Sequence, residues 1–232
     1  MAENLASFEQ ELQGKAVEIV HHACRRDIRE HGCKTCILGV LLTPAGLEIE
    51  QYMLSWLTRA YNVIAVRQPA PGTMFEYPAL RYAQLYAIQN NEPVLYLHTK
   101  GAANPCRTQR RILNLWKNEF IDSKPAYERH LAEADVLLPF SGPEQFTWLN
   151  GFIATPKAYA AIPPIVLSQD RYVYEELFRG SDLRFYCNRL DNVSRTETVD
   201  TRPLMYHEWR QCPPYFVGAP LLKIIKQLLG KE

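Results

Sequence analysis

Short apolar runs alternate with amphipathic segments along the first part of the chain. Apolar runs at residues 36–42, 61–66 and 94–98 have the length and composition of buried strands. The segments between them, residues 47–60 and 76–91, repeat their apolar positions with helical spacing. Strands and helices that alternate at this spacing predict an α/β fold with crossover connections, in which a mostly parallel sheet is flanked by helices.

The rest of the pattern extends this fold in both directions. Residues 4–30 carry apolar positions among charged ones, which predicts one or two amphipathic helices. We therefore divide the chain into an N-terminal helical segment (1–32), an α/β domain (33–218) and a C-terminal helix that packs on the core (219–232). Within the α/β domain, the pattern predicts helices at 107–121, 126–134, 155–161 and 168–178, strands at 135–139 and 183–187, a loop at 140–151 and an exposed segment at 188–201.

Composition excludes several classes of protein. A chain of 232 residues with 47% hydrophobic and 22% charged residues is typical of a globular protein with a sizeable core. The formal net charge of +1 shows no electrostatic signature of a nucleic-acid partner or an anionic membrane. Residues 1–10 contain acids and no apolar signal-peptide core, and no apolar run approaches 18 residues. We expect a cytoplasmic protein that is at most peripheral to a membrane.

The cysteines leave one alternative open. Cys33 and Cys36 have the CxxC spacing of a zinc or redox site, and further candidate ligands precede them at His21, His22, Cys24 and His31. A structural zinc site usually shows a second pair of ligands at matching spacing. Cys36 also opens an apolar run, where a reduced cysteine packs as a small hydrophobe. A zinc protein built on residues 21–36 is therefore the minor interpretation, and we predict no metal and no cofactor for the main site.

The main candidate site follows the apolar run at 94–98. His98, Thr99, Lys100 and Gly101 come where this buried strand is expected to end, and ligands of open α/β sheets bind at the carboxyl ends of strands. Lys100 could hold a phosphate as a point charge, and Gly101 lets the backbone turn or lie close to a ligand. A strand that ends in an exposed Lys-Gly turn is the ordinary structural alternative.

A basic stretch follows. Arg107, Arg110, Arg111 and Lys117 lie within eighteen residues of Lys100. Arginine forks suit a diphosphate or another polyanion. In a protein that carries as many acids, charges on a solvated helix surface explain the same residues equally well.

Several familiar motifs are missing. The sequence has no GxGxxG or GxxxxGK[ST] phosphate loop, no GxSxG, no HExxH and no DxD-type pair of carboxylates. An enzyme built on this chain should therefore stabilise a leaving phosphate with basic side chains and not with a carboxylate-held metal. Glu119, beside Phe120 and the basic stretch, is the most interesting candidate for a catalytic base; the other carboxylates that could serve are Asp135, Glu144, Asp170, Glu175 and Glu176.

Two segments together resemble a known group of proteins. The first is Tyr96-Leu97-His98-Thr99-Lys100-Gly101 with the following helix that carries Arg110, Arg111 and Trp116. The second is Phe146 to Ala154 with Tyr159 after it. They resemble bacterial glycosyltransferase-like proteins of surface-polysaccharide clusters, which carry a Tyr-x-His-Thr-Lys-Gly signature. The resemblance covers residues 94–164, and the second segment departs from the group's pattern, since it has Asn150-Gly151 in the reverse order and Phe152-Ile153 in place of paired tryptophans.

The resemblance implies a fold and a function. The fold would be a single GT-A-like, Rossmann-related domain, and the activity would be metal-independent transfer of a sugar from a nucleotide-sugar donor to a carbohydrate acceptor in surface polysaccharide synthesis. His98 and Glu119 are the candidate catalytic groups. The substrate-binding candidates are Tyr96, Thr99, Lys100, Gly101, Arg107, Arg110 and Arg111 for the sugar diphosphate, and Trp148, Asn150, Gly151 and Tyr159 for sugar rings.

Two further expectations concern partners. A non-catalytic nucleotide-sugar-binding or scaffold protein of the same fold is the alternative function, and the missing pair of carboxylates favours it. The apolar faces of the N- and C-terminal helices leave room for a homodimer, and no nucleic acid is expected to bind.

Overall fold

The computed structural model describes residues 4–28, 32–69, 74, 76–99, 107–139, 147 and 151–187. At residues 107–111, 127, 171, 172 and 187 it describes the backbone only. All of these residues belong to one compact unit, Met1–Val199. The predicted C-terminal helix at 219–232 and the exposed segment at 188–201 lie outside the described residues.

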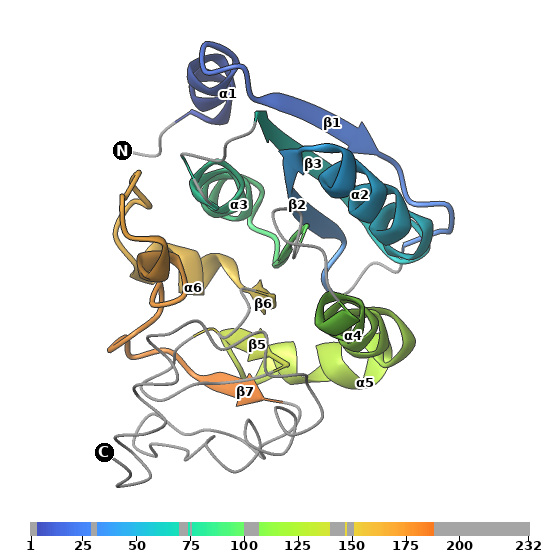
Figure 1. Cartoon of the computed structure of the whole chain (residues 1–232). Coiled ribbons are helices and arrows are strands. Elements are labelled where there is room, and N and C mark those ends of the chain that lie inside the picture. The colour runs from blue at the N-terminus through green and yellow to red at the C-terminus, as the bar shows by residue number, and fades with distance from the viewer. Residues whose placement is uncertain are drawn as a thin grey trace, which may run out of the picture. The chain divides into compact units, whose positions relative to one another are not determined.

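A seven-stranded mixed sheet forms the centre of this unit, with the strand order β1-β3-β2-β4-β6-β5-β7 (Figure 1). The predicted α/β class and the flanking helices are confirmed. The strands are β1 (Glu18–His22), β2 (Thr35–Leu42), β3 (Asn62–Pro69), β4 (Val94–His98), β5 (Val136–Leu138), β6 (Phe152–Ala154) and β7 (Phe185–Cys187).

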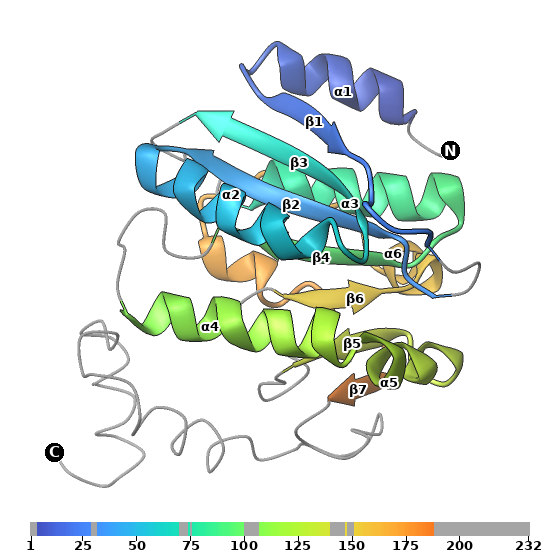
Figure 2. The ribbon, with the colours of Figure 1, turned by 90° about the vertical axis from the view of Figure 1, so that its right-hand side faces the viewer.

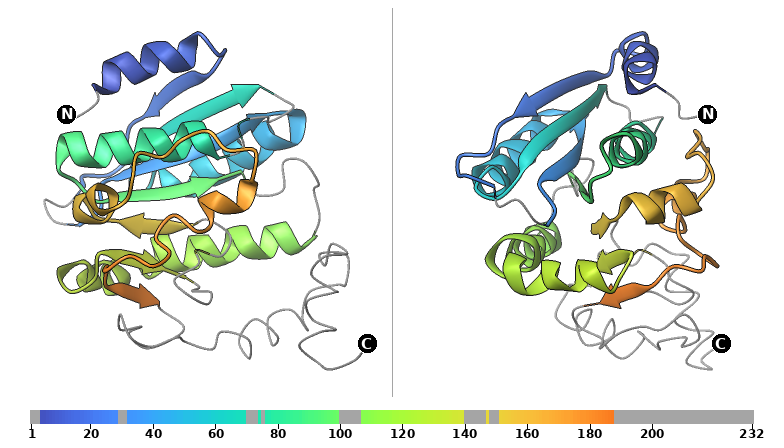
Figure 3. Two further views of the ribbon diagram at one scale, coloured as in Figure 1. Left: turned by 90° about the vertical axis from the view of Figure 1, so that its left-hand side faces the viewer. Right: turned by 180° about the vertical axis from the view of Figure 1, so that it is seen from behind.

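Helices cover both faces of the sheet. Helices α2 and α4 lie on one face (Figure 2), and α3 and α6 lie on the other (Figure 3). None of the described helices is both long and apolar enough to cross a membrane. The helical elements are α1 (Leu5–Gln13), α2 (Pro44–Leu57), α3 (Tyr77–Asn90), α4 (Arg107–Lys117), the π-helical turn η1 (Asn118–Asp122), α5 (Lys124–Glu128), the 3₁₀ turn η2 (Arg129–Ala132), α6 (Pro156–Ala161) and the 3₁₀ turn η5 (Arg171–Tyr174).

The prediction of a mostly parallel sheet is wrong. Three strand pairs are parallel (β2·β3, β2·β4 and β5·β7), and three are antiparallel (β1·β3, β4·β6 and β5·β6). A parallel neighbour requires a long crossover, usually a helix. The strands joined through α2 and α3 have one, whereas β6 follows β5 with no helix among the described residues between them. Strand β6 pairs antiparallel with both β4 and β5.

Two strands were not predicted. Strand β1 lies in the segment that the pattern assigned to helices: α1 ends at Gln13, Ala16 has a φ of 58°, and the chain then pairs with the edge of β3. Strand β6 contains three residues, too few to show an alternating pattern. The helix predicted at 168–178 is also wrong, because its regular part is the single turn η5.

Gln84 of α3 ties two parts of the fold together. Its side-chain oxygen accepts hydrogen bonds from the backbone N–H of Ile165 (2.9 Å) and from Arg81 (2.6 Å). Its side-chain nitrogen donates to the carbonyls of Tyr159 (3.2 Å) and Pro163 (3.1 Å). Gln84 is 2% exposed, so these groups would lie buried without partners if it were removed.

Replacing Gln84 by Ala should therefore lower the free energy of unfolding by about 2–4 kcal/mol, the cost of leaving several buried polar groups unsatisfied. Urea denaturation measures this change. The matched control is Asn90→Ala in the same helix: Asn90 is an exposed amide that donates to the carbonyl of Tyr86, and its loss should cost no more than about 0.5 kcal/mol. Equal effects of the two substitutions would contradict this role of Gln84.

Candidate functional site

The direction in which successive strands are added to the sheet reverses at β2. The chain leaves β2 through α2 to reach β3 on one side, and then returns through α3 to β4 on the other side of β2. A crevice forms outside the carboxyl ends of two such strands, and it is the usual ligand site of open α/β sheets. We call the residues around the ends of β2 and β4 the switch-point site.

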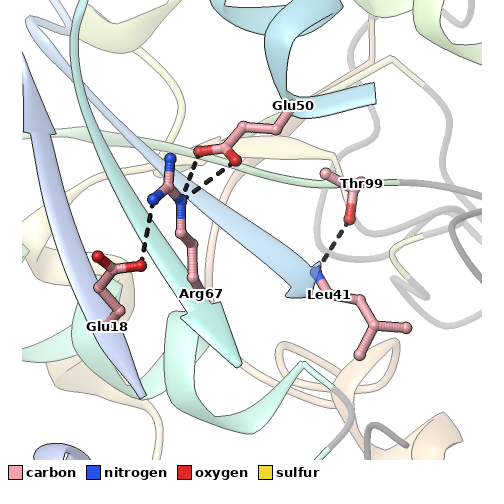
Figure 4. A network of polar contacts seen from close by, with 5 residues as sticks. All are labelled: Glu18, Leu41, Glu50, Arg67 and Thr99. Carbon is pink, nitrogen blue, oxygen red and sulfur yellow. Dashed lines mark hydrogen bonds and ion pairs between the residues drawn. The ribbon is translucent and has the colours of Figure 1, made fainter. Parts of the chain in front are cut away.

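Thr99 links the two strands at this point. Its backbone N–H donates to the carbonyl of Gly39 (2.8 Å), and its hydroxyl accepts a hydrogen bond from the N–H of Leu41 (3.3 Å; Figure 4). Thr99 is 7% exposed. The predicted site residue is therefore part of the β2·β4 junction.

A basic residue at the end of β3 is already neutralised. The Nε of Arg67 donates to both carboxylate oxygens of Glu50 (3.0 and 3.2 Å), and another guanidinium nitrogen donates to Glu18 (3.1 Å; Figure 4). Burial acts to lower the pKa of Arg67, but the hydrogen bonds to Glu50 and Glu18 outweigh it and raise this pKa. Arg67 therefore compensates the charge of the buried Glu50, and its own charge is not available to bind a phosphate.

His98 lies at the end of β4 and faces a carboxylate. Its Nδ1 is 3.8 Å from Oε1 of Glu76, the residue that precedes α3. Both side chains are largely buried, 11% and 18% exposed. The sequence analysis did not select Glu76. The signal that could have found it is its position. Glu76 directly precedes the helix that follows β3, and in a parallel arrangement the start of that helix lies near the carboxyl ends of the strands, where His98 also lies.

Trp116 connects the two segments that carry the resemblance. Its fully buried indole ring lies edge-on to the ring of His98, with a centroid distance of 5.7 Å. On another side it meets the backbone of Gly151: a Cβ placed there would be 2.5 Å from the indole Nε1. The structure thus brings together His98 and Gly151, which are far apart in the sequence, through a side chain to which we had given no role.

Two predicted substrate-binding tyrosines lie in the core. Tyr96 and Tyr159 are fully buried on the face that α3 and α6 cover. Their hydroxyls have no hydrogen-bond partner among the described residues. Burial, and then the charge of Glu76, raises the pKa of Tyr96 well above its ordinary value, and burial raises that of Tyr159 as well. Both hydroxyls therefore stay protonated, and neither is exposed to a ligand in this structure.

Glu119 lies toward the opposite edge of the sheet from His98. Glu119 is 8% exposed and belongs to η1. The backbone carbonyl of the next residue, Phe120, accepts a hydrogen bond (2.7 Å) from the hydroxyl of Tyr61, which directly precedes β3. Lys124, just after η1, donates to the carbonyl of Cys33 before β2 (2.8 Å). These contacts place η1 where the strands begin. The structure does not bring Glu119 together with the switch-point site, and its catalytic role stays a prediction.

Other predicted residues cannot be placed at the site. Arg107, Arg110 and Arg111 lie on α4, for which only the backbone of this first part is described. Lys100, Gly101, Trp148 and Asn150 lie outside the described residues.

The CxxC pair is buried in the core. Cys33 and Cys36 are fully buried, and the thiol of Cys33 contacts the carbonyls of Thr35 and Pro93, each at 3.3 Å. Burial raises the pKa of Cys33 to about 12 and that of Cys36 well above its ordinary value. A thiolate, the form that binds metal and attacks disulfides, is therefore disfavoured at both positions. The described residues contain no group of three or more His, Cys, Asp or Glu side chains that could hold a metal ion.

Asp135, another carboxylate considered as a base, is held at the amino end of β5. It accepts hydrogen bonds from Lys157 (3.0 and 3.1 Å) and from the backbone N–H of Arg184 (2.9 Å). Burial opposes ionisation, but the backbone hydrogen bond and Lys157 together lower the pKa of Asp135. This carboxylate therefore has a structural role as an anion. A catalytic base that works near neutral pH would instead need a raised pKa.

A depression of about 630 Å³ lies at the edge where β2 and β4 begin. Its walls include Lys34, Asn91, Glu92, Glu128 and Arg129. The depression therefore lies at the opposite ends of β2 and β4 from the switch-point site.

Comparison with known proteins yielded no relatives: no family model, no curated protein and no solved structure matches this chain.

The contact between Gly151 and Trp116 predicts strong coupling. Replacing Gly151 by Ala should lower the free energy of unfolding by about 1–3 kcal/mol, since the added methyl group overlaps a buried ring. In a Trp116→Phe background, which removes part of that ring, the same substitution should cost at least about 1 kcal/mol less. Urea denaturation of the four proteins measures this coupling, and strictly additive effects would rule the contact out.

The anchored carboxylate predicts a pH-dependent stability. A carboxyl group whose pKa is lowered by folding contributes stability that is complete above its ordinary value of 3.8 and is lost as the pH falls further through the folded-state value. Asp135→Asn should therefore lower the free energy of unfolding by about 1–3 kcal/mol at pH 7, and by less at a pH well below 3.8. Denaturant titrations at both pH values measure it; the control, Asp122→Asn, breaks only an exposed pair with Lys117 and should change little.

Proposed function

We propose that this protein binds a nucleotide sugar at the switch-point site and acts as a metal-independent glycosyltransferase on a carbohydrate acceptor. The observation that carries the proposal is the position of His98 and Thr99, the described residues in the middle of the Tyr-x-His-Thr-Lys-Gly signature. His98 ends β4 and Thr99 bonds to β2 at the point where α/β sheets bind ligands. The resemblance adds surface polysaccharide synthesis and a GT-A-like domain as the context of this activity.

The basic residues that follow β4 in the sequence suit a diphosphate. Lys100 follows Thr99 directly, and α4 begins with Arg107 and also carries Arg110 and Arg111. Arg67 is already paired with two carboxylates, so the sequence offers Lys100 and the three arginines as the cations for the donor. Basic side chains can stabilise a leaving diphosphate without a metal. On this proposal, the segment that contains Trp148, Asn150 and Gly151 would meet a sugar.

One observation favours the alternative, a nucleotide-sugar-binding or scaffold protein without catalysis. Glu119, the base that we preferred from the sequence, lies toward the edge of the sheet where the strands begin. The carboxylate that the structure places at the switch-point site is Glu76, and it faces His98. Donor binding is common to both functions, whereas turnover belongs only to the first.

A thermal-shift screen tests donor binding. The purified protein would be heated with nucleoside diphosphates and nucleotide sugars, with and without a divalent metal. A ligand at 100 times its Kd should add about 2.7 kcal/mol to the free energy of unfolding, which is a measurable rise in Tm. We expect such a rise without metal, and we expect Lys100→Ala to abolish it because one phosphate-binding cation is lost.

The matched control is Lys34→Ala, which removes a lysine at the opposite edge of the sheet and should leave the shift unchanged. No shift with any nucleotide in the wild-type protein would overturn donor binding. A shift without release of nucleoside diphosphate in the presence of carbohydrate acceptors would support the non-catalytic alternative.

A further inference from the structure

We infer that Glu76 is a positioning residue of the switch-point site: it holds His98 as an imidazolium whose Nε2–H donates to the donor's diphosphate. This inference rests on the proposed function. It assigns a role to a residue that no sequence motif selects, and it makes diphosphate binding depend on pH.

The geometry places the pair where such a role is needed. Oε1 of Glu76 lies 3.8 Å from Nδ1 of His98, which is within the range of an ion pair. Since Nδ1 faces the carboxylate, the nitrogen on the opposite side of the ring is Nε2. A neutral imidazole has one N–H donor, whereas an imidazolium has two, so protonation lets His98 serve Glu76 and a phosphate at once.

Packing keeps the imidazole ring in this orientation. Trp116 lies edge-on to it at 5.7 Å, with an interplanar angle of 81°, and the ring of Tyr96 lies on another side at 6.2 Å. The ring therefore has little freedom to turn away from Glu76.

Glu76 also lies where negative charge is stabilised. It occupies the N-cap position of the fourteen-residue helix α3, and its side chain makes no capping hydrogen bond. The positive end of a helix dipole favours an anion at this position. The carboxylate can therefore remain charged although it is 18% exposed, and it can pair with an imidazolium.

The other groups that face His98 from the described elements do not compete for the proton. Strand β4 contributes Tyr96, whose pKa is raised by burial and by Glu76, so its hydroxyl stays neutral. Helix α4 contributes the uncharged indole of Trp116, strand β2 contributes Gly39, and Thr99 has no titratable group. Among these groups, Glu76 is the one whose charge would stabilise a protonated His98, so the affinity for a diphosphate should fall as the pH rises through the titration of this histidine.

The first test is an NMR titration of the full chain with isotope-labelled histidine, in which the His98 signal is assigned by its absence from His98→Gln. Glu76→Gln should lower the pH at which His98 loses its proton, because the carboxylate no longer stabilises the charged ring. Glu76→Asp keeps the charge and should retain part of the effect. The matched control is Glu48→Gln, which removes an exposed carboxylate near the start of α2.

The second test uses inorganic pyrophosphate as the probe, with affinity measured by calorimetry at pH 6 and pH 8.5. The probe's own protonation is common to all variants, so only differences between variants count. At pH 6, Glu76→Gln and His98→Gln should each weaken binding about tenfold, the effect of losing one charge-assisted hydrogen bond, and Glu48→Gln should not. At pH 8.5 the three variants should differ much less from the wild-type protein.

The outcomes separate this inference from the proposed function. An unchanged His98 titration in both Glu76 variants would overturn the pairing, even if pyrophosphate binds. A shifted titration with weaker pyrophosphate binding in Glu76→Gln at pH 6 supports the whole inference. A shifted titration without pyrophosphate binding in the wild-type protein would overturn the role in diphosphate binding, and with it the proposed donor site.

Discussion

The burial of β4 on both faces is the constraint on which the rest of the structure depends. All five of its residues, Val94–His98, are buried, so helices must cover the strand on each side. Helix α3 and α6 pack on one face, and α2 and α4 pack on the other. Polar groups can reach a ligand only where such a strand ends, because its sides are in the core. Strand β4 itself can therefore contribute polar groups to a site only from its last residue, His98, onward.

Packing also decides which distant segments meet there. The indole of Trp116 fills the space between His98 and the backbone of Gly151, and a side chain at Gly151 would overlap it. Contact with the same buried ring fixes the positions of His98 and Gly151 relative to each other more tightly than an exposed hydrogen bond would, because a close-packed interior has few alternative arrangements. The same ring limits how closely Gly151, directly before β6, can approach the end of β4.

Much of the fold could be predicted from the sequence, and the failures have physical causes. Strands β2, β3 and β4 were found because continuous apolar runs mark strands that are buried on both faces. Strands β1 and β6 were missed because one lies at the sheet edge with half-exposed residues and the other has three residues. The orientation of β6 depends on its pairing with β4 and β5, which no local pattern reveals.

The candidate site was predictable only in part, for a similar reason. His98 and Thr99 could be placed from one strand and its end. The approach of Glu76 to His98 and the position of Trp116 depend on the pairing of β2 with β4 and on how α3 and α4 pack against them. Such contacts join residues from three elements and leave no periodic signal. The pairing of Arg67 with Glu18 and Glu50 likewise joins separate elements and could not be read from the sequence.

The electrostatics of the site limit how a diphosphate could be held. The Glu76–His98 pair is neutral overall when the histidine is protonated, so it would supply a directed donor and little net attraction. Arg67 is compensated by Glu18 and Glu50. On the proposed function, net positive charge would then come from Lys100 and the arginines of α4, which follow β4 in the sequence. Attraction and orientation would thus be supplied by different residues, and only orientation would depend on a proton in the physiological range of pH.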